Sequence, residues 1–232
     1  MDSTIFLLMR KCPQNHYSVY SSLYSMLELL FTNPLVFIVT ALALIISITI
    51  HEFSHAFVAD KLGDPTPRIQ GRLTLNPLAH LDPLGTLALL FTRFGWGKPV
   101  QFDPYNLKSP VKDGALIAIA GPISNLILAS ILALLFRSQL VPFDWLNFAI
   151  AQTVLINIVL AIFNLVPVHP LDGGKIILAL LPRNIAIEYE ELMNRYGLFL
   201  LLALIFPWYQ GQSPISYLIS PVINGVSRLL LQ

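Results

Sequence analysis

Charged residues are scarce in this chain of 232 residues. They make up 12% of it, about half of the roughly 25% that soluble globular domains carry. The formal net charge is +1, and no basic stripe is present to meet phosphate groups, so we expect no nucleic-acid partner. Cys12 is the single cysteine, which excludes an internal disulfide framework and a cysteine-rich metal site.

Hydrophobic residues, by contrast, form 55% of the chain and are gathered into long runs. Several runs reach the ~20 residues that cross a bilayer as a helix. Two shorter runs, 84–94 and 215–231, are expected to form a re-entrant or interfacial piece and an interfacial helix, respectively. We predict spanning helices over 35–59, 114–136, 146–166 and 196–209.

The sequence therefore predicts an all-α polytopic membrane protein, with a three-span core plus additional short or interfacial helices. Turn-forming residues fill the polar region after the first span. Within it, the short alternating pieces 68–75 and 99–102 predict strands of a small β-sheet. We expect a flexible N-terminal extension over 1–33, a membrane-embedded core over 34–182 and membrane-associated C-terminal helices over 183–232.

Lysine and arginine set the predicted orientation. The loop after the first span carries seven of them, the loop after the second carries only Arg137, and the loop after the third carries three. By the positive-inside rule, the first and third loops are cytoplasmic. The first and third spans then both end at the inner face, and each ends in a cluster of polar residues.

The first of these clusters, His51 to His55, matches the pattern HExxH. Residues four apart share one face of a helix, so the imidazoles of His51 and His55 can bind one metal ion. Glu52 lies to the side, where it can deprotonate a metal-activated water. A polar helix end that leaves the membrane is the alternative explanation, but such an end does not require this spacing.

A hydrolytic zinc site usually has three protein ligands, so a third must come from elsewhere. Asp172, directly after the third span, is the best carboxylate near membrane depth. Two alternatives stay open for this residue. Asp172 is a cap for a helix over 175–181, or His169 takes its place as the third ligand. The HExxH motif at the same depth favours Asp172 as the ligand. His80 is expected to be a polar loop residue at or above the mouth of the cavity.

Together these motifs resemble the site-2 protease family of intramembrane zinc metalloproteases, in particular its compact bacterial and archaeal members. The resemblance covers roughly 35–181. It rests on HEFSH at 51–55, GPISN at 121–125, NLVPVHPLDGG at 164–174 and GRLTLNPLAHLDPLGT at 71–86.

The resemblance implies one zinc ion per chain, held by His51, His55 and Asp172. It implies that Glu52 is the catalytic base and that Asn164 helps to hold the scissile carbonyl or its oxyanion. The family acts on membrane-protein substrates within the lipid bilayer. For this chain that implies a multi-pass protein of the cell membrane, with its active site toward the cytoplasmic side.

Two other classes of function fit part of the same pattern. A metal transporter would use His51, His55 and Asp172 as a transit site, and it would need a hydrated path open to both faces. The apolar outer halves of the spans argue against such a path. A catalytically inactive relative that acts as a scaffold would be free to lose metal ligands, whereas this chain retains all of them.

Overall fold

The computed structural model describes residues 26–92, 95–208 and 212–232. Residues 1–25 of the expected N-terminal extension (1–33) lie outside the described residues. The rest of the extension includes a short helix. The longer helices are α3 (Met26–Thr32), α4 (Pro34–Lys61), α6 (Pro83–Thr92), α7 (Pro110–Arg137), α8 (Asp144–Asn164), α9 (Asp172–Leu180), α10 (Arg183–Ile205) and α11 (Pro214–Leu231). The shorter ones are α5 (Thr66–Ile69), η1 (Pro77–Ala79) and η2 (Pro104–Asn106).

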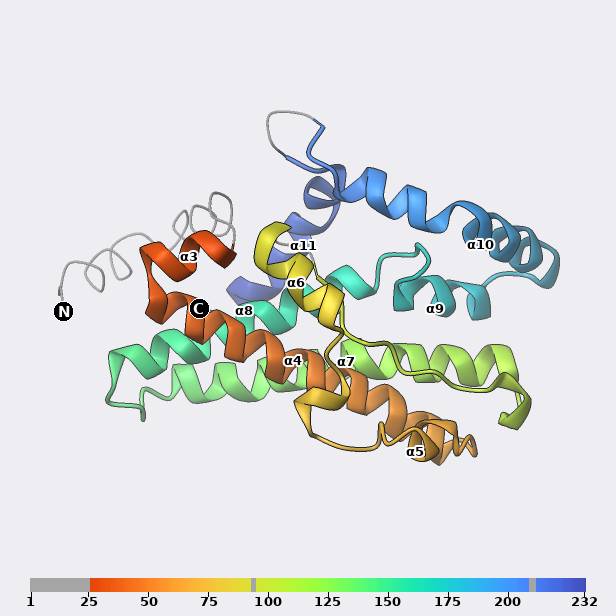
Figure 1. Cartoon of the computed structure of the whole chain (residues 1–232), viewed down its shortest axis with the longest axis horizontal. Helices are drawn as coiled ribbons and strands as arrows, with labels where there is room; N and C mark the ends of the chain where they lie inside the picture. The colour runs from red at the N-terminus through yellow and green to blue at the C-terminus, as the bar shows by residue number, and fades with distance from the viewer. Residues whose placement is uncertain (1–25, 93–94, 209–211) are drawn as a thin grey trace.

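Three long helices form the centre of the fold. α7 packs against both α4 and α8, and Figure 1 shows α4 and α8 running in the same direction with α7 antiparallel to them. All three are long and apolar enough to cross a membrane, which confirms the three predicted core spans. Small residues such as Ala129 and Ala133 are buried where α7 meets α8, and they let the two backbones approach closely.

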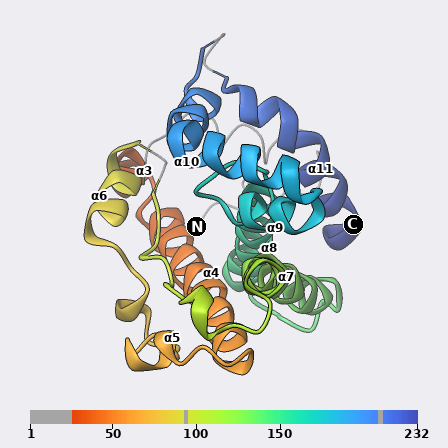
Figure 2. The ribbon, with the colours of Figure 1, turned by 90° about the vertical axis from the view of Figure 1, so that its right-hand side faces the viewer.

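The fourth predicted span was wrong. The first half of α10 carries charged residues, among them Glu188, Glu191 and Arg195, so its apolar part is only about half as long as a bilayer requires. Within the described residues, α11 is the fourth helix with the length and hydropathy of a span, although we expected it to be interfacial. α10 and α11 pack beside α9 and the end of α8, through a cluster that includes Val168, Met193 and Ile215 (Figure 2).

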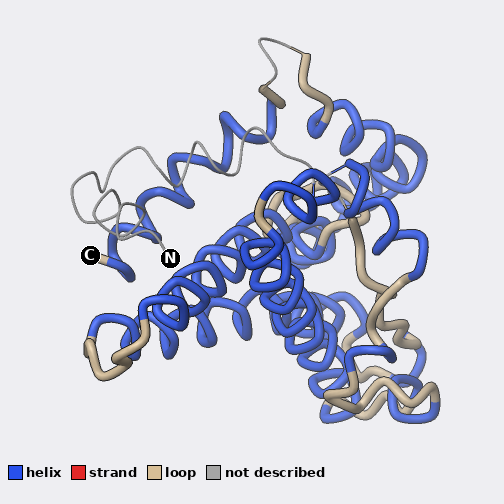
Figure 3. The backbone as a smooth tube through the Cα atoms, turned by 60° about the vertical axis from the view of Figure 1, so that its left-hand side comes forward, coloured by secondary structure: helices blue, strands red, loops and turns tan. Residues whose placement is uncertain are grey.

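The predicted β-sheet was also wrong. Among the described residues the structure has helices and loops but no strand (Figure 3). An isolated antiparallel bridge pairs Leu81 with Gly97. No ladder extends from it, because Pro99 has no N–H and the next backbone groups, the Lys98 and Pro99 carbonyls and the Val100 N–H, bond to side chains. The buried guanidinium of Arg72 donates to the carbonyls of Lys98 and Pro99, and to that of Ala79 as well.

The polar region between α4 and α7 is organised by a buried carboxylate, Asp64. It accepts hydrogen bonds from the backbone and hydroxyl of Thr66, the backbone N–H of Asp103 and the amide of Asn106. Burial alone would raise the pKa of Asp64, but these hydrogen bonds outweigh it and hold the pKa below its ordinary value. Asp64 thereby fastens the loop that precedes α7 to the end of α4.

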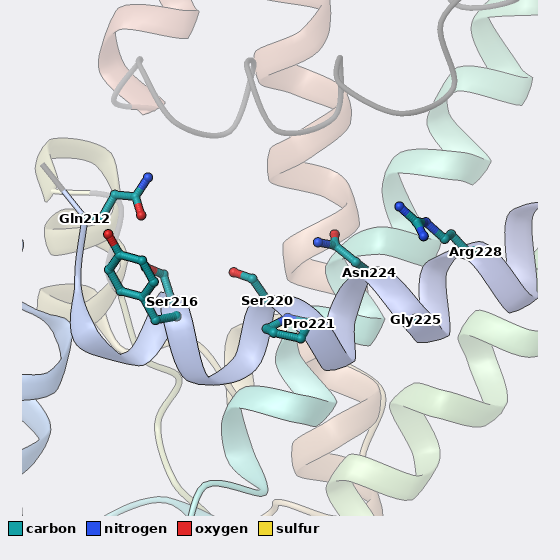
Figure 4. Close-up of a pocket in the computed structure, with 8 residues that line it drawn as sticks. Gln212, Ser216, Ser220, Pro221, Asn224, Gly225 and Arg228 are labelled. Atoms are coloured by element: carbon teal, nitrogen blue, oxygen red, sulfur yellow. The ribbon is translucent and has the colours of Figure 1, made fainter. Parts of the chain in front are cut away.

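A cavity along α11 has a volume of about 620 Å³. Ser216, Ser220 and Asn224 line it from the same side of the helix (Figure 4). α11 thus has a polar face and, around the helix from it, exposed apolar side chains such as Leu218 and Val222. No residue of the histidine motif lines this cavity.

Candidate metal centre

The two histidines of the HExxH motif lie in the C-terminal half of α4, on the face that packs against α7. Both side chains are buried. The Nε2 atoms of His51 and His55 are 3.0 Å apart, so the spacing of four residues brings both nitrogens to one point, as predicted.

Asp172 reaches the same point from α9. Its Oδ2 lies 3.1 Å from His51 Nε2 and 3.3 Å from His55 Nε2. The backbone of α9 can approach the end of α8 only because residue 173 is glycine, since a Cβ there would lie 2.4 Å from the Leu165 carbonyl oxygen. Leu171, not Asp172, is the N-cap of α9, and no side chain caps it. The capping alternative for Asp172 is therefore excluded.

Hydrogen bonds on the far side of each ring fix which nitrogen faces the centre. His55 Nδ1 lies 2.7 Å from the carbonyl oxygen of Ile117, which can only accept, so Nδ1 carries the proton. His51 Nδ1 lies 2.6 Å from Asn125 Oδ1 and donates to it in the same way. The Nε2 lone pairs of both rings consequently point toward Asp172.

This arrangement fits a bound cation. Three acceptor atoms, two imidazole nitrogens and one carboxylate oxygen, lie within 4.8 Å of one another. Asp172 Oδ2 is buried and has no hydrogen-bond donor among the described residues. Three acceptors facing one another repel unless positive charge lies between them, and two imidazoles with one carboxylate are a common ligand set for zinc.

Gly121 of α7 provides the space at the centre. A Cβ at this position would lie 2.5 Å from His55 Nε2 and 2.6 Å from His51 Nε2, which is closer than any side chain tolerates. The glycine of the GPISN motif therefore lets α7 pack directly against both imidazoles.

Glu52 is partly buried beside the histidines. Its Oε2 accepts a hydrogen bond of 3.1 Å from the backbone N–H of Val100. The segment that follows the Leu81–Gly97 bridge thus contacts the carboxylate through its backbone. The sequence alone gave no signal for this contact, because it depends on how a loop 48 residues later returns to α4.

The other predicted residues lie in different surroundings. Asn164 is the last residue of α8, and its amide donates to the carbonyl of Leu160, so its role stays a prediction. His169 is not part of the three-residue cluster. His80 lies in a loop, as expected, but it is completely buried rather than at a cavity mouth, and its Nε2 bonds to the Thr74 carbonyl.

Sequence reasoning missed two buried residues behind His51. Asn157 of α8 and Ser47 of α4 are fully buried and hydrogen-bonded to each other, and Asn157 also bonds to Asn125. Each is a polar residue inside an apolar run, which in a membrane protein is a signal of function.

Comparison with known proteins agrees with this site. The model of peptidase family M50 matches residues 138–204. Several relatives carry the name "Putative zinc metalloprotease", among them YwhC and Rip2. YwhC of Bacillus subtilis strain 168 is 40% identical, over 79% of this chain and 85% of YwhC. Rip2 of Mycolicibacterium smegmatis is 33% identical, over 60% of this chain and 55% of Rip2.

A more distant relative, "Zinc metalloprotease MJ0392" of Methanocaldococcus jannaschii, is 28% identical over 66% of this chain and 37% of that protein. No solved structure gives a significant match. The four apolar helices and these relatives indicate a multi-pass membrane protein and a zinc metalloprotease. The chain belongs to peptidase family M50, the site-2 protease family, and is of its compact bacterial type.

Proposed function

We propose that this metalloprotease hydrolyses peptide bonds of protein segments that lie within or beside the lipid bilayer. One observation carries the proposal. Three buried acceptor atoms converge beside Glu52, and Glu52 belongs to α4, a helix that is apolar enough to cross a membrane. One zinc ion per chain, held by His51, His55 and Asp172, satisfies all three acceptors.

The chemistry follows from the positions of the side chains. Zinc bound to this ligand set would polarise the scissile carbonyl and lower the pKa of a water molecule. Glu52 takes a proton from the attacking water and then delivers it to the leaving amine. The backbone N–H of Val100 donates a hydrogen bond to the Glu52 carboxylate and orients it.

We assign support of the oxyanion to Asn164. Its Nδ2 carries two N–H bonds, of which the Leu160 carbonyl takes one. α8 ends at Asn164, and Asp172 follows after a short loop. The amide therefore belongs to the same end of the bundle as the carboxylate ligand.

We place this end of the bundle toward the cytoplasm. α4 and α8 run in parallel (Figure 1), and the loops that follow them carry most of the lysine and arginine residues. The substrate is then a membrane-protein segment that enters from the bilayer and unwinds locally, because a helix hides its peptide groups from the attacking water.

The test uses the full chain in proteoliposomes together with a single-span peptide, and mass spectrometry identifies the fragments. Glu52→Gln lowers the cleavage rate by about 10²- to 10⁴-fold, as expected for loss of a general base. Glu188→Gln, at an exposed position of α10, leaves the rate unchanged. Cleavage by Glu52→Gln at the wild-type rate refutes the assignment, and zinc flux without cleavage supports the transporter instead.

A further inference from the structure

Three polar side chains lie at the heart of the apolar bundle and take no part in the proposed chemistry. They are Ser47 of α4, Asn125 of α7 and Asn157 of α8, and each is 0% exposed. Uncompensated polar groups are costly in such surroundings. Their hydrogen bonds therefore merit a complete account.

Asn125 uses all of its amide. Its Oδ1 accepts from His51 Nδ1 at 2.6 Å, and its Nδ2 donates to Asn157 Oδ1 at 2.7 Å and to the Ser47 carbonyl at 3.1 Å. A reversed amide would place Oδ1 against two acceptors and its N–H groups against His51. The present orientation is therefore the one that the surroundings require.

Asn157 is fixed in turn. Its Nδ2 donates to the hydroxyl of Ser47 at 2.8 Å and to the Thr153 carbonyl at 2.8 Å, and its Oδ1 accepts from Asn125. The hydroxyl of Ser47 donates to the Ala43 carbonyl at 2.6 Å. Backbone carbonyls on α4 and α8, which can only accept, thus set the direction of every bond as far as His51.

We propose that Asn157 is a positioning residue for His51, acting through Asn125. Its Oδ1, the nearer of the two acceptors on the Asn125 amide, works with the Ser47 carbonyl to keep that amide from reversing. This keeps the His51 proton on Nδ1 and the lone pair on Nε2, facing Asp172. The inference rests on the proposed zinc site. In zinc proteins, partners that hydrogen-bond a histidine ligand directly, as Asn125 does, are worth about 10- to 100-fold in metal affinity, and a residue that acts through Asn125 changes the affinity by no more than that.

The experiment measures zinc affinity in detergent by competition with a chelator, and the absorption spectrum of the Co²⁺-substituted chain. Asn157→Leu keeps the branched shape and the number of side-chain heavy atoms but removes the Oδ1 acceptor. It weakens zinc binding by about 10- to 100-fold and alters the Co²⁺ spectrum. Asn147→Leu is the matched control on the same helix, because Asn147 bonds to the Val141 carbonyl instead. It leaves both readouts unchanged.

A double-mutant cycle separates positioning from general loosening of the bundle. If Asn157 acts through Asn125, adding Asn157→Leu to Asn125→Leu weakens zinc binding no further. Additive losses, or an Asn157→Leu chain with wild-type zinc affinity, overturn the inference. If Asn157→Leu does not fold, Ser47→Ala decides. It removes one bond to Asn157 and weakens zinc binding several-fold, whereas unchanged affinity overturns the inference.

The readout also separates this inference from the proposed function. A chain that binds zinc in an Asn157-dependent manner but cleaves no membrane peptide refutes the proteolytic proposal and leaves the positioning role intact. A chain that cleaves the peptide, but whose zinc affinity is unchanged by Asn157→Leu, supports the proteolytic proposal and refutes the positioning role of Asn157.

Discussion

Replacing Gly121 by alanine tests the geometry of the centre with a single methyl group. The added Cβ would lie 2.5 Å from His55 Nε2 and 2.6 Å from His51 Nε2, whereas an ordinary contact is about 3.5 Å. The imidazoles or α7 must therefore retreat by about 1 Å. Metal–ligand distances tolerate only about 0.2 Å, so we expect Gly121→Ala to weaken zinc binding by at least about 100-fold, or about 2.7 kcal/mol.

The assay is chelator competition for zinc on purified protein, with thermal unfolding as a check of the fold. Gly225→Ala on α11 is the control, since a Cβ there meets nothing within 4 Å. It leaves zinc affinity unchanged and stabilises its helix by up to about 1 kcal/mol. If Gly121→Ala binds zinc within about threefold of the wild type, the close packing of α7 on the imidazoles is not what shapes the site.

Three further predictions concern the rest of the structure. Because hydrogen bonds lower the pKa of Asp64, its stabilising contribution is complete above pH ~4 and is lost as the pH falls through the lowered pKa. In thermal unfolding between pH 5 and pH 2, Asp64→Asn therefore loses less stability than the wild type. Unfolding temperatures that fall equally with pH in both proteins would contradict this. Arg72→Met leaves the Lys98 and Pro99 carbonyls without their donor and costs about 1–3 kcal/mol. It also speeds chymotryptic cleavage after Trp96 in the same loop, and an unchanged cleavage rate argues against a role of Arg72 in holding this loop. Chelation of zinc lowers the unfolding temperature of the wild type but not of His51→Ala, and an equal response of both proteins would place the zinc elsewhere.

The parts of the site that follow from local periodicity could be predicted from the sequence. The spacing of His51 and His55 places both on one face of any helix, and the long run of apolar residues before them predicts a helix that crosses the membrane. Asp172 needed one more step, the parallel direction of the first and third spans. That step depends only on counting spans and basic loop residues, so it was also within reach.

The supporting contacts were out of reach because they depend on three-dimensional packing. Nothing in the sequence says that Gly121 faces the imidazoles or that Asn157 bonds to Asn125, since both facts depend on the rotation of α7 and α8 about their axes. The strand prediction at 68–75 failed for a related reason. The alternating pattern there comes from a loop wrapped around the buried Arg72, and alternation alone does not distinguish that loop from a strand.

The ligand set is divided between distant parts of the chain, which has a consequence for biosynthesis. His51 and His55 emerge from the ribosome early, whereas Asp172 emerges only after two further spans have been made. Under the proposed assignment, a nascent chain has imidazoles without their carboxylate partner until its third long helix is complete. Proteolytic competence then arises late, once assembly in the bilayer is well advanced, so an unfinished chain cannot attack its neighbours.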